Sequence, residues 1–138
     1  ITQWDLHAGL SIPSYDDGNT DTIKAGMTVA IEPFVTNGGG YVVNGKPGNI
    51  VEIARGDKPV EDPKAKEFLE YVKGEFHELP FCARSCDFPK AELYVRKLLH
   101  LGVLSSFSQL VEVNKGIVTQ HEYTFYIDGA RGEITTAP

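Results

Sequence analysis

The sequence predicts an α+β fold, because a block with helical periodicity interrupts two segments that have strand periodicity. Residues 1–54 are rich in β-branched residues, which are separated by clusters of turn-forming Gly, Pro, Asn and Asp. From about residue 61 apolar side chains recur at helical spacing, and the strand pattern returns after residue 106. We therefore expect strands in 1–54, a helical insertion in 55–106 and returning strands in 107–138.

Four segments of the first part have the composition of β-strands: LHAGLSIP (6–13), MTVAIEPFV (27–35), GYVVN (40–44) and NIVEIA (49–54). Two polar segments between them, DDGNTD and TNGGG, are typical of turns, and TNGGG favours a hairpin. Pro33 directly follows Glu32 and has no N–H for a ladder hydrogen bond. We therefore expect the strand to bulge, or to lie at a sheet edge, at this point.

The middle part predicts three helices, over 61–76, 81–86 and 87–102. The first has Asp62 as a plausible N-cap and Pro63 at the first helical position. Gly102 is placed to end the third helix.

The last part predicts two strands, QLVEV (109–113) and IVTQHEYTFYI (117–127), joined by a hairpin turn at Asn114-Lys115-Gly116. A second turn at Asp128-Gly129 precedes the short strand GEITT.

Charge and apolar content argue against two classes of partner. The net charge is −6 and no basic run is present, whereas nucleic acid and anionic membranes both need clustered Lys and Arg. No apolar run approaches the roughly 18 residues of a membrane span. Cys82 and Cys86 have a spacing open to two interpretations, a pair of free thiols on one helix face or a zinc site. Free thiols would indicate the cytoplasm.

Three polar residues lie within otherwise apolar segments: His7, Glu32 and Glu122. Each glutamate could be solvated or salt-bridged on an open sheet face. Alternatively, two carboxylates on neighbouring strands would repel each other unless a cation compensates them, and oxygen ligands suit a divalent metal ion.

Four motifs, LHAGLSIP, GMTVAIEPFVTNGGG, LPFCARSC and GIVTQHEYT, resemble in order and spacing the type II methionine aminopeptidases, especially the archaeal form. The resemblance implies the pita-bread (creatinase/aminopeptidase) fold, in which two α/β halves carry a dinuclear metal site over a curved antiparallel sheet. The chain would form the C-terminal half of that sheet. Its helical block would be the winged-helix-like insertion of type II enzymes.

The resemblance also assigns roles to the three polar residues. Two divalent ions (Co, Mn, Fe or Zn) would be bound by five ligands, of which Glu32 and Glu122 are the two glutamates. Glu122 would bridge the ions, Glu32 would also act as the general base, and His7 would hydrogen-bond the substrate amide. The other three ligands, two Asp and a His, lie upstream of His7 in the family.

We therefore expect a C-terminal part of a longer cytoplasmic metalloaminopeptidase, which removes the N-terminal Met from peptides and nascent proteins. Its partner would be the N-terminal half of the same protein, without which the chain is not competent. The pocket for the Met side chain would draw by register on Leu6, Phe34, Pro80 and Phe107, although plain core packing is the alternative for these residues.

The motif around Glu122 departs from the family pattern Gln-Phe-Glu-His-Thr, because His121 precedes the glutamate and Tyr123 follows it. Strand alternation places both on the face opposite Glu122, so the ligand itself should survive. Two alternatives share the fold: a non-catalytic homologue that binds RNA or protein, and a proline-specific peptidase. The retained glutamates argue against the first, and the helical insertion argues against the second.

Overall fold

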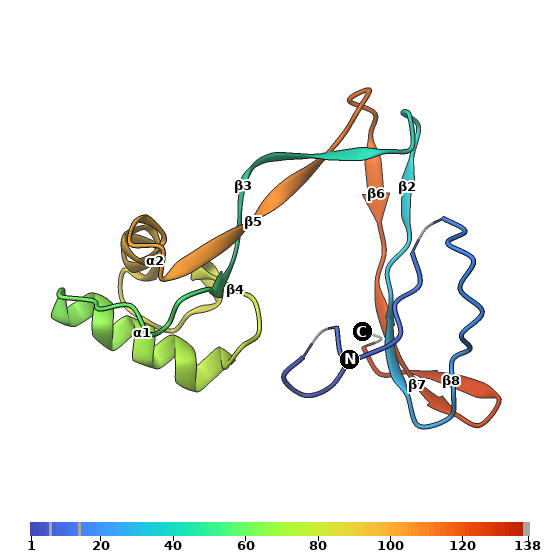
Figure 1. Ribbon diagram of the computed structural model, residues 1–138, viewed down its shortest axis with the longest axis horizontal. Helices are drawn as coiled ribbons and strands as arrows, with labels where there is room; N and C mark the ends of the chain where they lie inside the picture. Colours follow the sequence, from blue (N-terminus) through green and yellow to red (C-terminus); the bar gives the residue numbers. More distant parts are fainter. Residues whose placement is uncertain (6, 14, 137–138) are drawn as a thin grey trace. The chain divides into compact units, whose positions relative to one another are not determined.

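The computed structural model describes residues 1–5, 7–13 and 15–136. Within these residues the chain forms strands, two α-helices and one short 3₁₀ helix (Figure 1). In chain order the elements are β1 (Thr28–Ile31), β2 (Phe34–Thr36), β3 (Val42–Ile53), α1 (Pro63–Phe76), β4 (Phe81–Cys82), η1 (Ala83–Ser85), α2 (Ala91–His100), β5 (Leu104–Glu112), β6 (Val118–Gln120), β7 (Tyr123–Asp128) and β8 (Arg131–Ile134). The mixture of sheets and helices agrees with the predicted α+β class.

The chain divides into two compact units. Unit 1 comprises 1–43 together with 112–138, and unit 2 comprises 44–111. Unit 2 extends beyond the predicted helical insertion at both ends, because β3 and β5 pair with each other beside the helices. The assignment of these units to a catalytic domain and its insertion stays a prediction.

The hydrophobic core of the described residues lies entirely in unit 2. Helices α1 and α2 pack on a sheet in which β3 lies between β4 and β5. The buried apolar residues are Val51, Ala65, Phe68, Leu69, Val72, Phe81, Ala91, Val95, Leu98, Val103 and Leu104. Because α1 contributes four of them at helical spacing, burial of one face stabilises this helix.

The predicted start of the first helix and end of the third are confirmed, whereas the third helix begins at Ala91 and not at residue 87. Asp62 is the N-cap of α1, and its side chain accepts hydrogen bonds from the backbone N–H groups of Lys64 at 2.9 Å and Ala65 at 3.1 Å. Pro63 occupies the first position, where a missing N–H costs nothing. Helix α2 ends before Gly102, which has a φ of +64°.

We expect Gly102→Ala to destabilise unit 2 by about 1 kcal/mol, because an L side chain strains this left-handed backbone. An added Cβ would also meet Lys58 Nζ at 2.8 Å, which donates to the carbonyl oxygen of Leu101 at the end of α2. The measurement is urea unfolding followed by helical circular dichroism. Gly74→Ala is the matched control, because Gly74 lies inside α1 with open space around its Cβ position. The control should be neutral or stabilising, and equal losses in both variants would contradict the backbone argument.

Unit 1 consists of two small antiparallel sheets. The first has the order β1-β7-β8, and the second pairs β2 with β6. The hairpin of β7 and β8 turns at the predicted Asp128-Gly129, where Gly129 has a φ of +58°.

Three local predictions of strands and helices are corrected. Residues 7–13 form no strand, and Gly9 and Pro13 weaken strand pairing there. The two strands predicted over 40–54 are one continuous strand, β3. The segment 81–86 is not an α-helix, because its first two residues pair with β3 and only η1 is helical.

The turns at 36–40 and 114–116 are not hairpin turns. The strands that flank each turn pair elsewhere, since β2 pairs with β6 whereas β3 pairs with β5. Each turn therefore connects a strand of the β2–β6 pair to a strand of the β3–β5 pair.

Candidate metal centre

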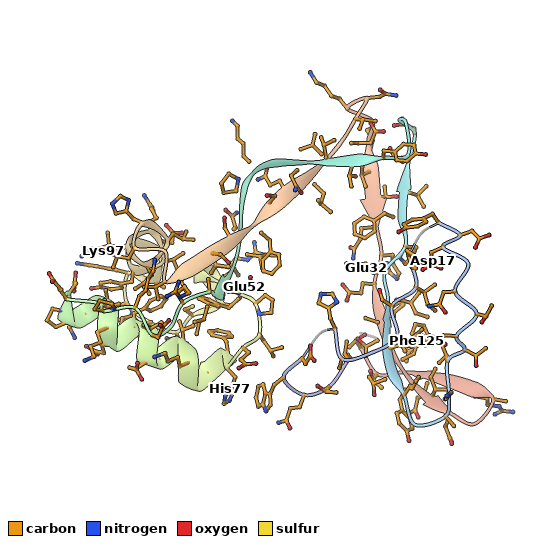
Figure 2. All side chains as sticks on the ribbon, in the orientation of Figure 1. Asp17, Glu32, Glu52, His77, Lys97 and Phe125 are labelled. Carbon is orange, nitrogen blue, oxygen red and sulfur yellow. The ribbon has the colours of Figure 1, made fainter. Side chains whose placement is uncertain are left out.

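Glu32 and Glu122 lie at matching interruptions of two neighbouring strands. Ile31 at the end of β1 pairs with Tyr123 at the start of β7, and the next pairing joins Phe34 of β2 to Gln120 of β6. Both glutamates therefore fall between the same two rungs, in residues that belong to no strand (Figure 2 labels Glu32). The interruption that Pro33 predicts is present, and it occurs in both strands.

One backbone hydrogen bond joins the two interruptions. The N–H of His121 donates to the carbonyl oxygen of Pro33 at 3.3 Å. Pro33 itself has no N–H to offer, so the regular ladder cannot continue through this point. An irregularity in a strand can turn a side chain out of the sheet, so a carboxylate at this point can be directed toward a ligand.

A single amide lies between the two carboxylates. Gln120 Nε2 donates to Glu32 Oε2 at 3.0 Å and contacts Glu122 Oε2 at 3.4 Å. The fold thus brings together the two glutamates that the sequence singles out, and both are exposed. Two carboxylates that share one neutral donor form a site of negative charge, which suits a divalent cation. Their roles as metal ligands stay a prediction.

These carboxylates would be only part of a metal-binding shell. Among residues 1–5, 7–13 and 15–136, no group of three or more His, Cys, Asp or Glu side chains is placed to hold an ion. His7 is exposed in the segment before β1, and its backbone N–H donates to Asp5 Oδ1 at 2.9 Å. Its role toward the substrate amide stays a prediction. The donor set therefore fits a metal ion in chemistry, while most of the ligands would have to come from elsewhere.

The predicted substrate pocket is not assembled within either unit. Leu6 lies outside the described residues, and Phe34 is an exposed residue of unit 1. Pro80 is half-buried and Phe107 exposed, and both belong to unit 2. The pocket assignment stays a prediction.

His121 and Tyr123, which strand alternation places on the same face, contact each other. Their rings meet edge to face, with centroids 4.5 Å apart. The two residues that depart from the family motif therefore form an aromatic contact with each other, on either side of Glu122 in the sequence.

Sequence patterns missed Glu112, the buried charged residue of the described chain, which is 4% exposed. Its carboxylate accepts hydrogen bonds from four backbone N–H groups: those of Gly39, Gly40 at 3.1 Å, Asn114 at 2.7 Å and Gly116 at 2.8 Å. These bonds, led by that from Gly116, lower the pKa of Glu112 although burial opposes the shift. Because these hydrogen bonds occupy its oxygens, Glu112 connects the turn at 36–40 to the turn at 114–116 instead of binding a ligand.

No helix of the described chain is long and apolar enough to cross a membrane. Cys82 and Cys86 are free thiols, although the turn between them is a 3₁₀ helix and not the predicted α-helix.

Comparison with curated proteins finds methionine aminopeptidases. The chain is 36% identical to that of Thermococcus onnurineus over 141 aligned positions, which cover 99% of the chain and 48% of the relative. It is 37% identical to that of Archaeoglobus fulgidus, over 94% of the chain and 44% of the relative. For Saccharolobus solfataricus the identity is 31%, with 94% and 44% covered. The chain spans about half the length of these relatives and resembles their C-terminal portion.

Among solved structures, the chain is similar to a thermophilic Arx1 with a TM-score of 0.63 and 16% identity. The similarity covers 83% of the chain and 32% of the Arx1 chain. Together with the curated relatives it supports the pita-bread fold, while the winged-helix-like character of the insertion stays a prediction. No family model matches the chain.

Proposed function

We propose that this chain is the C-terminal portion of a methionine aminopeptidase, a metal-dependent hydrolase of N-terminal Met residues. Similarity to curated members of that family over nearly the whole chain supports the proposal. The observation that carries it is the meeting of Glu32 and Glu122 at paired strand interruptions, with Gln120 between them.

The chemistry follows from these two carboxylates. Two divalent ions (Co, Mn, Fe or Zn) would be held by Glu32 and Glu122 together with ligands from the N-terminal half. Such ions lower the pKa of water and polarise a carbonyl group. Glu32 accepts the proton of the attacking water and delivers it to the leaving amine, as a general base and then an acid. His7 hydrogen-bonds the substrate amide.

The partner that completes the site is the N-terminal half of the same protein. Unit 1 supports this proposal because its described residues include no buried apolar side chain, since the buried ones all lie between residues 51 and 104. Its strands instead expose Ile31, Phe34, Val35, Val118, Tyr126 and Ile134. Small sheets with an uncovered apolar face are marginal in water, so another layer of protein is needed over them.

The substrate is the N-terminus of a peptide or nascent protein in the cytoplasm. Its Met side chain would enter an apolar pocket, and the lining residues predicted for that pocket from the sequence are Leu6, Phe34, Pro80 and Phe107. Neither nucleic acid nor membrane is needed for this activity, in agreement with a net charge of −6. A non-catalytic homologue that binds RNA or protein is disfavoured, because it would have no use for two carboxylates held together.

We expect the purified 138-residue chain to hydrolyse Met-Ala-Ser more than about 1,000-fold slower than the protein with both halves, in Co²⁺ or Mn²⁺. The reason is that two carboxylates cannot hold two ions in a reactive geometry. Release of free Met measures the rate. Brisk hydrolysis by the chain alone would contradict the need for a second half. An inactive complete protein would favour the non-catalytic alternative.

A further inference from the structure

Two thiols outside the proposed metal centre flank one helical turn of unit 2. Cys82 ends β4, and Cys86 follows η1 directly. Both side chains are half-buried and neither is in a disulfide. The turn is held by a hydrogen bond from the N–H of Cys86 to the carbonyl oxygen of Ala83 at 3.3 Å.

The two sulfurs are in contact with the same turn. The thiol of Cys86 donates to the carbonyl oxygen of Cys82 at 3.5 Å, so its sulfur lies against the backbone of the other cysteine. Cys82 Sγ lies 3.1 Å from the hydroxyl oxygen of Ser85, a donor that can stabilise a thiolate. Both sulfurs therefore lie at one short turn, which a disulfide between them would close.

The surroundings make the two thiols chemically unequal. The Ser85 hydroxyl, with a smaller contribution from the Arg84 charge, lowers the pKa of Cys82. Burial raises the pKa of Cys86, and the neighbouring Cys82 adds to that effect. Reactive cysteines are those with thiolate character and access to solvent, and a second cysteine beside such a residue can resolve the sulfenic acid that oxidation produces.

We propose that Cys82 and Cys86 form a reversible, peroxide-sensitive thiol pair. The Cys82 thiolate attacks the O–O bond of a hydroperoxide, which yields a sulfenic acid at Cys82 and releases the reduced alcohol, or water in the case of hydrogen peroxide. The sulfur of Cys86 then attacks the Cys82 sulfur, forms the disulfide and displaces the hydroxyl group, which leaves as water with the Cys86 proton. Two thiols are oxidised by two electrons while one peroxide is reduced.

The disulfide would fix the turn that connects β4 to η1. Cys82 pairs with Ile50 of β3, and Cys86 packs against the core of unit 2. The closed loop is short, so it removes little entropy from the unfolded chain, and the effect should stay local.

The test treats the 138-residue chain with hydrogen peroxide, blocks remaining thiols with N-ethylmaleimide and measures the intact mass. We expect a monomer that has lost two hydrogens and takes up no blocking group, and dithiothreitol should restore two reactive thiols. A disulfide between two chains, or direct conversion to sulfinic acid without a disulfide, would overturn the proposal. This readout is independent of aminopeptidase activity.

Single variants assign the order of events. Cys86→Ser should accumulate a sulfenic acid that dimedone traps at Cys82, because nothing resolves it. Cys82→Ser should consume peroxide at least about tenfold more slowly, because burial raises the pKa of Cys86 and only Cys82 has the contact with the Ser85 hydroxyl that favours a thiolate. Equal rates of peroxide consumption in the two variants would show that Cys82 is not the preferred site of oxidation. Helical circular dichroism confirms that each variant is folded before its rate is compared.

Discussion

Glu122→Gln in the protein with both halves is expected to reduce hydrolysis of Met-Ala-Ser at least about 1,000-fold. Glutamine keeps the shape of the side chain, but it removes the negative charge that would bridge two cations. It also places a second amide beside Gln120, which already contacts Glu122 Oε2 at 3.4 Å. The loss should appear in kcat, together with a lower content of bound metal.

Glu133→Gln supplies the matched control for that variant. Glu133 is an exposed residue of β8, paired across the hairpin with Tyr126, in the sheet that begins immediately after Glu122. The charge change is the same, so activity should stay within about twofold of the unaltered protein. If Glu122→Gln retained full activity and metal content, the proposed bridging role would be wrong. Comparable losses in both variants would instead indicate a general effect of charge.

Glu32→Gln distinguishes the two roles given to that residue. A residue that acts both as ligand and as base should lose activity even at metal concentrations that restore binding. Activity recovered by excess Mn²⁺ alone would limit Glu32 to metal binding.

Local signals in the sequence predicted those parts of the fold that depend on neighbours in the chain. The Asp62-Pro63 start of α1 and the end of α2 at Gly102 are set by backbone chemistry within a few residues. The interruption at Glu32 likewise follows from the missing N–H of Pro33. The strand predicted over 6–13 is absent from residues 7–13, because composition alone supplies no pairing partner.

The candidate site was predicted in part for the same reason. Glu32 and Glu122 were singled out as charges in apolar strands, and their motifs resemble those of a known family. The second interruption, at Glu122, has no proline beside it and follows from pairing with the first. Gln120, which contacts both carboxylates, carries no sequence signal beyond its place in the motif.

Glu112 escaped prediction because its partners are remote in the chain. Gly39 lies 73 residues before Glu112, and the two turns that it joins were each interpreted as a separate hairpin. The sequence signal for these hydrogen bonds is limited to a glutamate two residues before Asn-Lys-Gly and a Gly-Gly-Gly run elsewhere in the chain. Nothing in strand periodicity says that the two belong together.

Glu112→Ala is expected to lower the melting temperature of unit 1 by roughly 10 °C or more. The variant leaves four backbone N–H groups without their acceptor at a place where space is lacking. A Cβ on Gly38 would meet the Glu112 carboxylate carbon at 2.3 Å, and one on Gly116 would meet the Gly38 backbone nitrogen at 2.6 Å. The chain has one tryptophan, Trp4, in unit 1, so its fluorescence reports on this unit. Helical circular dichroism reports on unit 2, where both α-helices of the described residues lie.

The pH dependence of stability gives an independent test of the hydrogen bonds that Glu112 accepts. The pKa of Glu112 is lower in the folded chain than its ordinary value of 4.5, chiefly because of the Gly116 N–H. A lowered folded-state pKa contributes stability above the unfolded pKa, and that stability is lost as pH falls through the folded pKa. The unaltered chain should therefore lose stability progressively below about pH 4.5, whereas Glu112→Gln starts lower and loses less over the same interval. Glu133→Gln should follow the unaltered chain, because its side chain is exposed. Parallel acid profiles for the unaltered chain and Glu112→Gln would mean that another carboxylate governs acid unfolding, since only a charged Glu112 can accept all four N–H groups.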